Sequence, residues 1–301
     1  MKKFKLYDFL RKDNVAAIIF VLPFVIGLIA FLAVPMGMSL YYAFSQFNII
    51  SPPTFIGLEN FRRMGSDAQL WQSVRVTFQF VLLSVPLRLA FALGIAMLLF
   101  KSTKMMGIYR AMYYLPSMLG GSVAVAILWR RLFFVTGTFN NVILEAFGLN
   151  RNFSWLGDTR TAIWTLILLA VWQFGSSMLI FLAGLKQIPE TYYEAANIDG
   201  AGKIYSFFRI TFPLITPTIF FNLIMQTIGG FLTFNSAFLI TGGGPLGTTN
   251  FFALYMYDQT FAFHNAGYAA ALAWFMLGLL AIVAGLLFGS KRFWVYEGGF
   301  S

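Results

Sequence analysis

One glycine-rich stretch of the chain has the spacing of a phosphate-binding loop. Residues 242–249 read GGGPLGTT, and Gly242 and Gly247 are spaced like the two glycines of that motif. The motif also needs a lysine that neutralises the β- and γ-phosphates, and Thr248 stands at its position. The stretch is therefore predicted to be a tight turn of glycine and proline, and a nucleotide site is rejected.

Residue types that perform covalent chemistry or hold metals are sparse. The chain has no cysteine, and its one histidine, His264, has no second histidine or carboxylate at ligand spacing. No serine lies in a nucleophile-elbow context, and the 11 acidic residues fall almost entirely in loops and at element ends. We expect no metal site and no enzymatic activity in this chain.

Arg88 is a cation halfway along a long apolar run, with 12 uncharged residues on each side. Because burying such a charge in a membrane is costly, its side chain is expected to face a bundle interior or a wet cavity. It either contacts a transported substrate or forms a structural contact with a backbone carbonyl, a neighbouring subunit or the membrane rim. The residue pattern leaves both interpretations open.

Amide, hydroxyl and indole groups also interrupt the apolar segments. Sugars bind through planar hydrogen-bonding groups beside an aromatic face, which is the chemistry that these residues supply. Interhelical hydrogen bonds that hold membrane helices together are the alternative role. Together with Arg88, the candidates for a substrate pathway are Trp172, Gln173, Asn222, Gln226 and Asn235.

A short charged segment separates two of the apolar runs. Pro189 and Glu190 favour a helix start and Gly200 and Gly202 favour its end, so a helix of about 11 residues is predicted. An interfacial amphipathic helix would favour Lys and Arg on its polar face, whereas this one carries acids. We expect a docking element whose small and acidic side chains are Glu194, Ala195, Ala196, Asp199 and Gly200.

The elements that position these residues must lie in a membrane. Of the 301 residues, 59% are hydrophobic and 11% are charged, whereas soluble domains average about 25% charged residues. The chain is therefore predicted to be an all-α integral membrane protein. We attribute its formal charge of +10 to basic cytoplasmic loops and expect no nucleic-acid partner.

Six segments are long enough to cross a bilayer, which takes about 20 apolar residues. Gly229-Gly230 is expected to end the fifth span, before a re-entrant piece at 231–240. The basic N-terminus precedes an uncharged run long enough to be a retained span, not a cleaved signal. The spans are predicted at about 15–44, 76–100, 108–129, 161–185 and 210–228, and within 267–288.

The distribution of basic residues predicts the orientation. With both termini in the cytoplasm, 13 Lys and Arg residues are cytoplasmic and 7 are external. The charged helix then lies in the cytoplasm, between spans four and five. The predicted organisation is a tail, first span and external segment at 1–75, a five-span core at 76–290, and a cytoplasmic tail at 291–301.

The charged segment resembles the EAA motif of permease subunits in binding-protein-dependent ABC importers. That pattern is Glu-Ala-Ala, three residues, glycine, nine residues, isoleucine, one residue, leucine and proline. This chain matches the pattern at residues 194–196, Gly200, Ile210 and Pro213, and Phe212 replaces the leucine. Four further stretches resemble the carbohydrate-uptake branch of the family: FIGLENF at 55–61, RAMYYLPSM at 110–118, AILWRRLF at 126–133 and LITGGGP at 239–245.

The resemblance implies a function as half of the translocation pathway for a sugar in the bacterial cytoplasmic membrane, and an oligosaccharide is the expected substrate. It implies a second, similar permease subunit, two ATPase subunits on the cytoplasmic face and an extracytoplasmic sugar-binding protein. ATP and Mg²⁺ would be held by the ATPase subunits, so this chain would need no cofactor. Residues 194–196 with Asp199 and Gly200 would form the helix that couples to an ATPase subunit. Gly243, Gly244 and Pro245 would lie near the external mouth.

The alternative function is an ion-coupled secondary transporter that acts without ATPase partners. Such carriers usually have acidic residues within the membrane or inverted repeats. No Asp or Glu lies inside a predicted span, which counts against this class. A non-transport scaffold is a third possibility, and the broken fifth span and Arg88 argue against a purely structural bundle.

Overall fold

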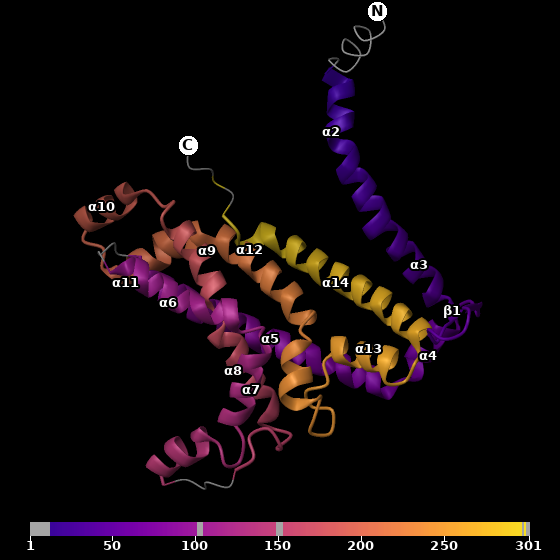
Figure 1. The fold of residues 1–301 in the computed structure, drawn as a ribbon. Coiled ribbons are helices and arrows are strands. Elements are labelled where there is room, and N and C mark those ends of the chain that lie inside the picture. Colours follow the sequence, from indigo (N-terminus) through magenta and orange to yellow (C-terminus); the bar gives the residue numbers. More distant parts are fainter. Residues whose placement is uncertain (1–12, 101–104, 149–152, 297, 299–301) are drawn as a thin grey trace, which may run out of the picture. The chain divides into compact units, whose positions relative to one another are not determined.

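A computed structural model describes residues 13–100, 105–148, 153–296 and 298, and these are predominantly helical (Figure 1). The chain divides into two compact units, Met1–Ser66 with Asp258–Met276, and Asp67–Tyr257 with Leu277–Ser301. The predicted basic N-terminal tail, Lys101, Lys104 and Arg151 lie outside the described residues, as do residues 297 and 299–301 of the predicted C-terminal tail. The predicted domain boundaries stay a prediction.

The first unit begins with one long helical rod. α2 (Asp13–Leu28), the π-helical η1 (Ile29–Ala33) and α3 (Val34–Ala43) follow one another without a break. Phe20–Ala43 is long and apolar enough to cross a membrane, and its side chains are almost all exposed. An apolar surface of this kind is stable where it faces lipid.

A small polar structure follows this rod within the first unit. β1 (Ser45–Gln46) pairs antiparallel with β2 (Thr54–Phe55), a minor exception to the predicted all-α class. The buried side chain of Asn60, in α4 (Glu59–Ser66), donates hydrogen bonds of 2.9 and 3.0 Å to the carbonyls of Ala43 and Ser45. These two bonds fasten α4 to the end of α3.

The second unit is built around α5 (Ala68–Leu98), which packs against three helices: α8 (Ala162–Trp172), α9 (Gly175–Leu185) and α12 (Phe212–Phe231). The side chain of Asp67 caps α5 by accepting hydrogen bonds from the backbone N–H groups of Gln69 and Leu70, each at 3.1 Å. The cap lies in polar sequence and begins the helix eight residues before the predicted start of the second span at residue 76.

The predicted third span is not a single segment. α6 (Met106–Leu119) and α7 (Val123–Leu132) meet at an angle of 94°. Gly120 follows the end of α6, and the hydroxyl of Ser122 caps α7 by accepting from the backbone N–H of Val125 at 3.3 Å. Beyond α7 lies the π-helical η2 (Phe139–Leu144).

The fourth predicted span is also bent. α8 (Ala162–Trp172) and α9 (Gly175–Leu185) differ in direction by 42°. Gly175 begins α9, where a β-carbon would lie 2.5 Å from the carbonyl oxygen of Tyr113 and 2.7 Å from the Cα of Tyr114. Glycine thus lets the backbones of α9 and α6 come into contact. The short α10 (Glu190–Ile198) follows.

The fifth span is longer than predicted at both ends. α11 (Lys203–Ser206), η3 (Phe207–Thr211) and α12 (Phe212–Phe231) form one helix of 29 residues. The predicted break at Gly229-Gly230 is wrong, because the helix continues through both glycines. A β-carbon on Gly230 would lie 3.0 Å from Cγ2 of Val81, so this glycine serves close packing against α5. The helix ends only at Phe231.

The predicted re-entrant piece contains a break after Phe231 and then the π-helical η4 (Ala237–Thr241). The segment between the predicted re-entrant piece and the predicted sixth span, 241–266, contains the helix α13 (Phe252–Phe261). α14 (Ala266–Trp294) extends six residues beyond the predicted sixth span. Four described helices are long and apolar enough to span a membrane, or six if each bent pair counts as one span.

Candidate functional site

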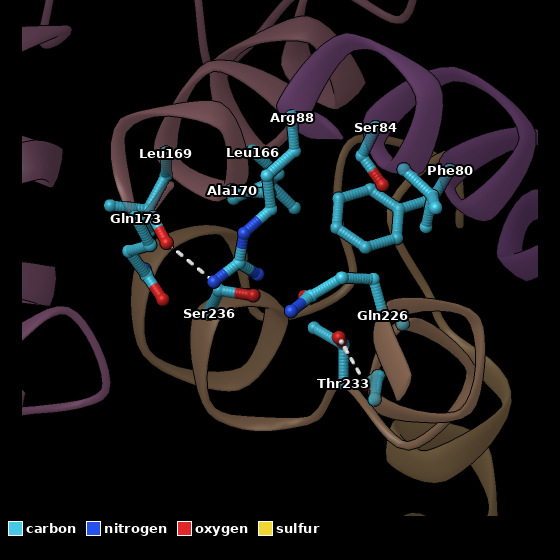
Figure 2. A pocket seen from close by; sticks show the side chains of 13 residues that line it. Phe80, Ser84, Arg88, Leu166, Leu169, Ala170, Gln173, Gln226, Thr233 and Ser236 are labelled. Atoms are coloured by element: carbon cyan, nitrogen blue, oxygen red, sulfur yellow. Dashed lines mark hydrogen bonds between the residues drawn. The ribbon is translucent and has the colours of Figure 1, made fainter. Parts of the chain in front are cut away.

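A cavity of about 210 Å³ lies within the second unit (Figure 2). Its walls come from α5, from α8 and the residues that follow it, and from the end of α12 and the break beyond it. Apolar side chains such as Phe80 and Leu166 form part of the lining. Its polar side chains are Ser84, Arg88, Gln173, Gln226, Thr233 and Ser236.

Arg88 projects from α5 into this cavity (Figure 2). Its Nη2 donates a hydrogen bond to the backbone carbonyl of Gln173 and lies 3.4 Å from the hydroxyl of Ser176. Its Nε is buried and has no hydrogen-bond acceptor. Among the described residues, the guanidinium has no carboxylate within ion-pair distance. It is therefore held by neutral oxygens alone.

The backbone at Gln173 joins three helices. The break between α8 and α9 frees its carbonyl, which accepts from Arg88 and also from the hydroxyl of Ser117 in α6 at 2.8 Å. The same hydroxyl accepts from the backbone N–H of Ser176 at 3.0 Å, and the Gln173 side chain donates to the carbonyl of Gly120 at 3.2 Å. Sequence reasoning missed Ser117, because a serine near a helix end carries no distinctive signal.

Gln226 brings α12 into the same group. Its Nε2 donates a 3.0 Å hydrogen bond to the hydroxyl of Ser177 in α9. Arg88 and Gln226 point toward the same space (Figure 2). Three of the predicted pathway residues, Arg88, Gln173 and Gln226, thus line one cavity. Sequence reasoning also missed Ser84, an isolated serine among apolar neighbours, and Ser236, which directly follows the predicted Asn235.

The other three predicted pathway residues do not line this cavity. The ring of Trp172 lies 5.8 Å from that of Trp129, centroid to centroid, in a tilted arrangement. Asn222 is fully buried, and its Nδ2 donates to the carbonyl of Thr218 at 3.2 Å within α12. Asn235 is exposed beyond the end of α12. Interhelical or local packing accounts for the first two positions.

The predicted charged helix forms as α10, with Pro189 at its N-cap and Asp199 at its C-cap. Gly200 adopts φ 76°, which requires glycine or strain in another residue, and it ends the helix as expected. Glu194 and Asp199 are both exposed.

A surface hollow of about 630 Å³ is lined by Ala195 and Ala196 of α10 and by Asp199 and Gly200, which follow it, whereas Glu194 does not line it. The hydroxyl of Tyr193 lies 2.9 Å from that of Thr211, which attaches α10 to the helix that begins at Lys203. α10 therefore combines an open face with a direct link to the fifth span at Thr211 of η3.

The glycine-rich loop is a compact turn, as predicted. Gly242, Gly243 and Gly247 have φ values of 60°, 82° and 75°, which favour glycine. The buried hydroxyl of Thr249 lies 2.6 Å from the carbonyl oxygen of Gly244, across the base of the loop.

A side chain of α5 also holds this loop. The Nε2 of Gln72 donates a 2.9 Å hydrogen bond to the carbonyl of Leu246. The loop that carries Gly243, Gly244 and Pro245 is therefore fixed to the beginning of α5.

Comparisons with known proteins agree over nearly the whole chain. Residues 89–292 match the family described as "Binding-protein-dependent transport system inner membrane component". The "Probable ABC transporter permease protein YesP" of Bacillus subtilis (strain 168) is 49% identical over 290 residues, which are 95% of this chain and 94% of that protein. The "Sulfoquinovosyl glycerol transport system permease protein SmoG" of Agrobacterium fabrum is 34% identical over 270 residues, covering 89% and 87% of the two chains.

A solved structure has the same fold. One chain of a bacterial ABC transporter involved in the import of the acidic polysaccharide alginate superposes with a TM-score of 0.80. The two chains share 22% sequence identity, and the match covers 96% of this chain and 98% of that one.

Proposed function

We propose a specific role for this chain, which belongs to the family of binding-protein-dependent transport system inner membrane components. It is the permease subunit of an ATP-driven importer of sugars and forms half of the translocation pathway. Relatives described as transporting starch degradation products and arabinooligosaccharides support an oligosaccharide as the substrate. The single observation that carries the coupling role is α10, an exposed helix with a small and acidic face.

The proposed topology has six spans, with each bent helix pair crossing the membrane once and both termini in the cytoplasm. The excess of Lys and Arg in the segments assigned to the cytoplasm supports this orientation. It places α10 on the cytoplasmic face, between the α8–α9 pair and the helix Lys203–Phe231. The glycine-rich loop then lies on the external face.

The proposed partners follow from this arrangement. A second permease subunit completes the pathway, two ATPase subunits that hold ATP and Mg²⁺ bind at the cytoplasmic face, and a sugar-binding protein docks outside. Gly243, Gly244 and Pro245 lie near the external mouth, where that protein releases its sugar. This chain performs no covalent chemistry and holds no cofactor of its own.

The coupling mechanism uses the links between α10 and the fifth span. A groove on an ATPase subunit receives α10 and contacts Glu194, Ala195, Ala196, Asp199 and Gly200. Movement of that subunit displaces α10, and the contact between Tyr193 and Thr211 passes the displacement to the helix Lys203–Phe231. The far end of this helix lines the cavity through Gln226, Gly229 and Gly230. Movement of the helix therefore changes the shape of the pathway.

The test reverses the charge of an exposed acid on α10. Glu194→Lys is expected to lower co-purification of the ATPase subunits, and substrate-stimulated ATP hydrolysis, by at least about tenfold, which corresponds to roughly 1.4 kcal/mol of lost binding. The protein should still insert into the membrane, because Glu194 is exposed and has no packing role.

Glu59→Lys is the matched control, since Glu59 is an exposed acid on α4, which the proposed topology places outside the membrane. Its ATPase subunits should co-purify as in the wild type. Full ATP hydrolysis and sugar uptake by a complex that carries both Glu194→Lys and a bulky residue at position 200 would refute the coupling role.

A further inference from the structure

The cavity in the second unit has an unbalanced charge. Arg88 is its only charged lining residue. None of the eight acidic side chains that the structure describes lines the cavity, and none lies in the four helices long enough to span a membrane: Glu59, Asp67, Glu145, Asp158, Glu190, Glu194, Asp199 and Asp258. The described part of this chain therefore supplies no counter-ion for Arg88.

The hydrogen bonds of Arg88 leave part of its guanidinium unused. Nη2 faces the carbonyl of Gln173 and the hydroxyl of Ser176, while the buried Nε has no acceptor. Arg88 is half-buried, and the neutral oxygens around it satisfy donors but do not neutralise its charge. A cation that is partly withdrawn from water without an anion nearby is disfavoured. An anion that entered the cavity would accept a hydrogen bond from Nε and would neutralise the charge of the guanidinium.

The remaining lining suits a sugar. Ser84, Gln226, Thr233 and Ser236 present hydroxyl and amide groups, which can exchange hydrogen bonds with sugar hydroxyls. Phe80 contributes an aromatic side chain to the wall (Figure 2). The volume of about 210 Å³ is below the roughly 300–1,000 Å³ of sites for drug-sized ligands. The cavity therefore suits one sugar unit of a longer substrate.

We propose that Arg88 is a specificity-determining residue that binds an acidic group on the transported sugar, so that the substrate class is anionic saccharides. A planar guanidinium pairs in two-point fashion with a carboxylate or a phosphate, which share this chemistry. The inference rests on the proposed function, because it assigns the substrate class of the same pathway.

A purely structural role would account for only part of the geometry. The bond to the Gln173 carbonyl ties α5 to the break between α8 and α9, and a neutral donor could make the same bond. It gives no reason for a full positive charge beside a cavity, or for an Nε without an acceptor. A structural tie and an anion site therefore predict different substrate dependence for the same variant.

The test uses the complete importer in proteoliposomes, with the partner permease, the ATPase subunits and the binding protein. The probes are a panel of hexuronate di- and trisaccharides of different linkage, the same panel after reduction of each carboxylate to hydroxymethyl, and phosphorylated disaccharides. Uptake is measured for the wild type, Arg88→Gln, Arg88→Lys and Arg75→Gln. Arg75 is the matched control, an exposed arginine on the same helix that does not line the cavity.

A second measurement removes selection by the binding protein. Equilibrium binding of the same radiolabelled probes is measured on the permease–ATPase complex in nanodiscs without the binding protein. Arg88→Gln should lower the binding of anionic probes by at least tenfold and leave the binding of reduced probes within about twofold. Arg88→Lys should retain an intermediate preference, because it keeps the charge and loses the planar fork. Arg75→Gln should match the wild type.

The outcomes separate this inference from the proposed function. The inference is supported if the wild type takes up anionic probes in preference to reduced probes and Arg88→Gln loses this preference. Comparing the uptake of the hexuronate and phosphorylated probes then identifies the acidic group. Uptake of neutral probes alone, or an equal loss of all probes in Arg88→Gln, overturns it and leaves a sugar importer. If the wild type takes up no sugar of any class, the proposed function itself fails.

Discussion

At the scale of single residues, Thr77 shows how one hydroxyl connects distant segments of the second unit. It is buried in α5, where its hydroxyl donates to the carbonyl of Ser73 at 2.8 Å and accepts from the backbone N–H of Phe252 at 2.9 Å. Phe252 begins α13, and the first N–H groups of a helix have no acceptor within it. Thr77 supplies an acceptor from 175 residues away.

Thr77→Val is expected to lower the free energy of unfolding by about 1–3 kcal/mol, because it removes the acceptor of a buried N–H group. Thr165→Val is the matched control, since Thr165 is equally buried and its hydroxyl donates only to the carbonyl of Ala162 in its own helix. Thr165→Val should lower the free energy of unfolding by less than about 1 kcal/mol. Thermal unfolding in detergent measures both, and equal losses would contradict the capping role of Thr77.

At the scale of elements, the end of α10 depends on one backbone conformation. Gly200 has φ 76°, whereas Gly202, two residues later, has φ −72°. A β-carbon at either position would meet open space. The two glycines therefore differ in backbone strain and not in packing.

This contrast gives a matched pair of variants. Gly200→Ala is expected to destabilise the left-handed conformation at the end of α10 by about 1–2 kcal/mol, because this conformation brings the new β-carbon close to the backbone. The resulting fraying of α10 should lower substrate-stimulated ATP hydrolysis several-fold. Gly202→Ala should leave hydrolysis unchanged. Hydrogen exchange at residues 195–199 checks the cause, and equal protection in both variants would refute it.

At the scale of the whole molecule, the natural absence of cysteine makes the orientation directly measurable. Ile198 in α10 and Leu246 in the glycine-rich loop are 87% and 86% exposed. Lys203–Phe231 lies between them and is long and apolar enough to span a membrane. The proposed topology places the two side chains on opposite faces.

Ile198→Cys and Leu246→Cys test this placement. In spheroplasts, a maleimide that cannot cross membranes should label Leu246→Cys alone, and both variants should react after permeabilisation. The unmodified chain is the control and should not react. Labelling of both variants before permeabilisation would mean that the intervening helix does not cross the membrane.

Residue types and local spacing sufficed for much of the description at every scale. The low charge content predicted a membrane protein, and the apolar lengths located the long helices. Pro189 and Gly200 predicted the bounds of α10 almost to the residue, because caps depend on a few neighbouring residues. The EAA pattern was sufficient for the family, which the comparisons confirm.

Two glycine pairs show what local sequence could not decide. Gly120-Gly121 lies at a bend of 94°, whereas Gly229-Gly230 lies inside a continuous helix. The same dipeptide is flexible in both places, and its conformation depends on what packs against it: the Gln173 side chain faces Gly120 and Val81 faces Gly230.

The sequence by itself therefore determined the class of protein, its apolar helices and the short charged helix α10, since these depend on composition and short-range order. Only the tertiary structure decided which polar residues meet. Arg88 reaches the carbonyl of Gln173, 85 residues away, because α8 ends there and α5 crosses that end. Trp172, next to Gln173, lies outside the cavity. Helix crossings and breaks set such contacts, and no local pattern encodes them.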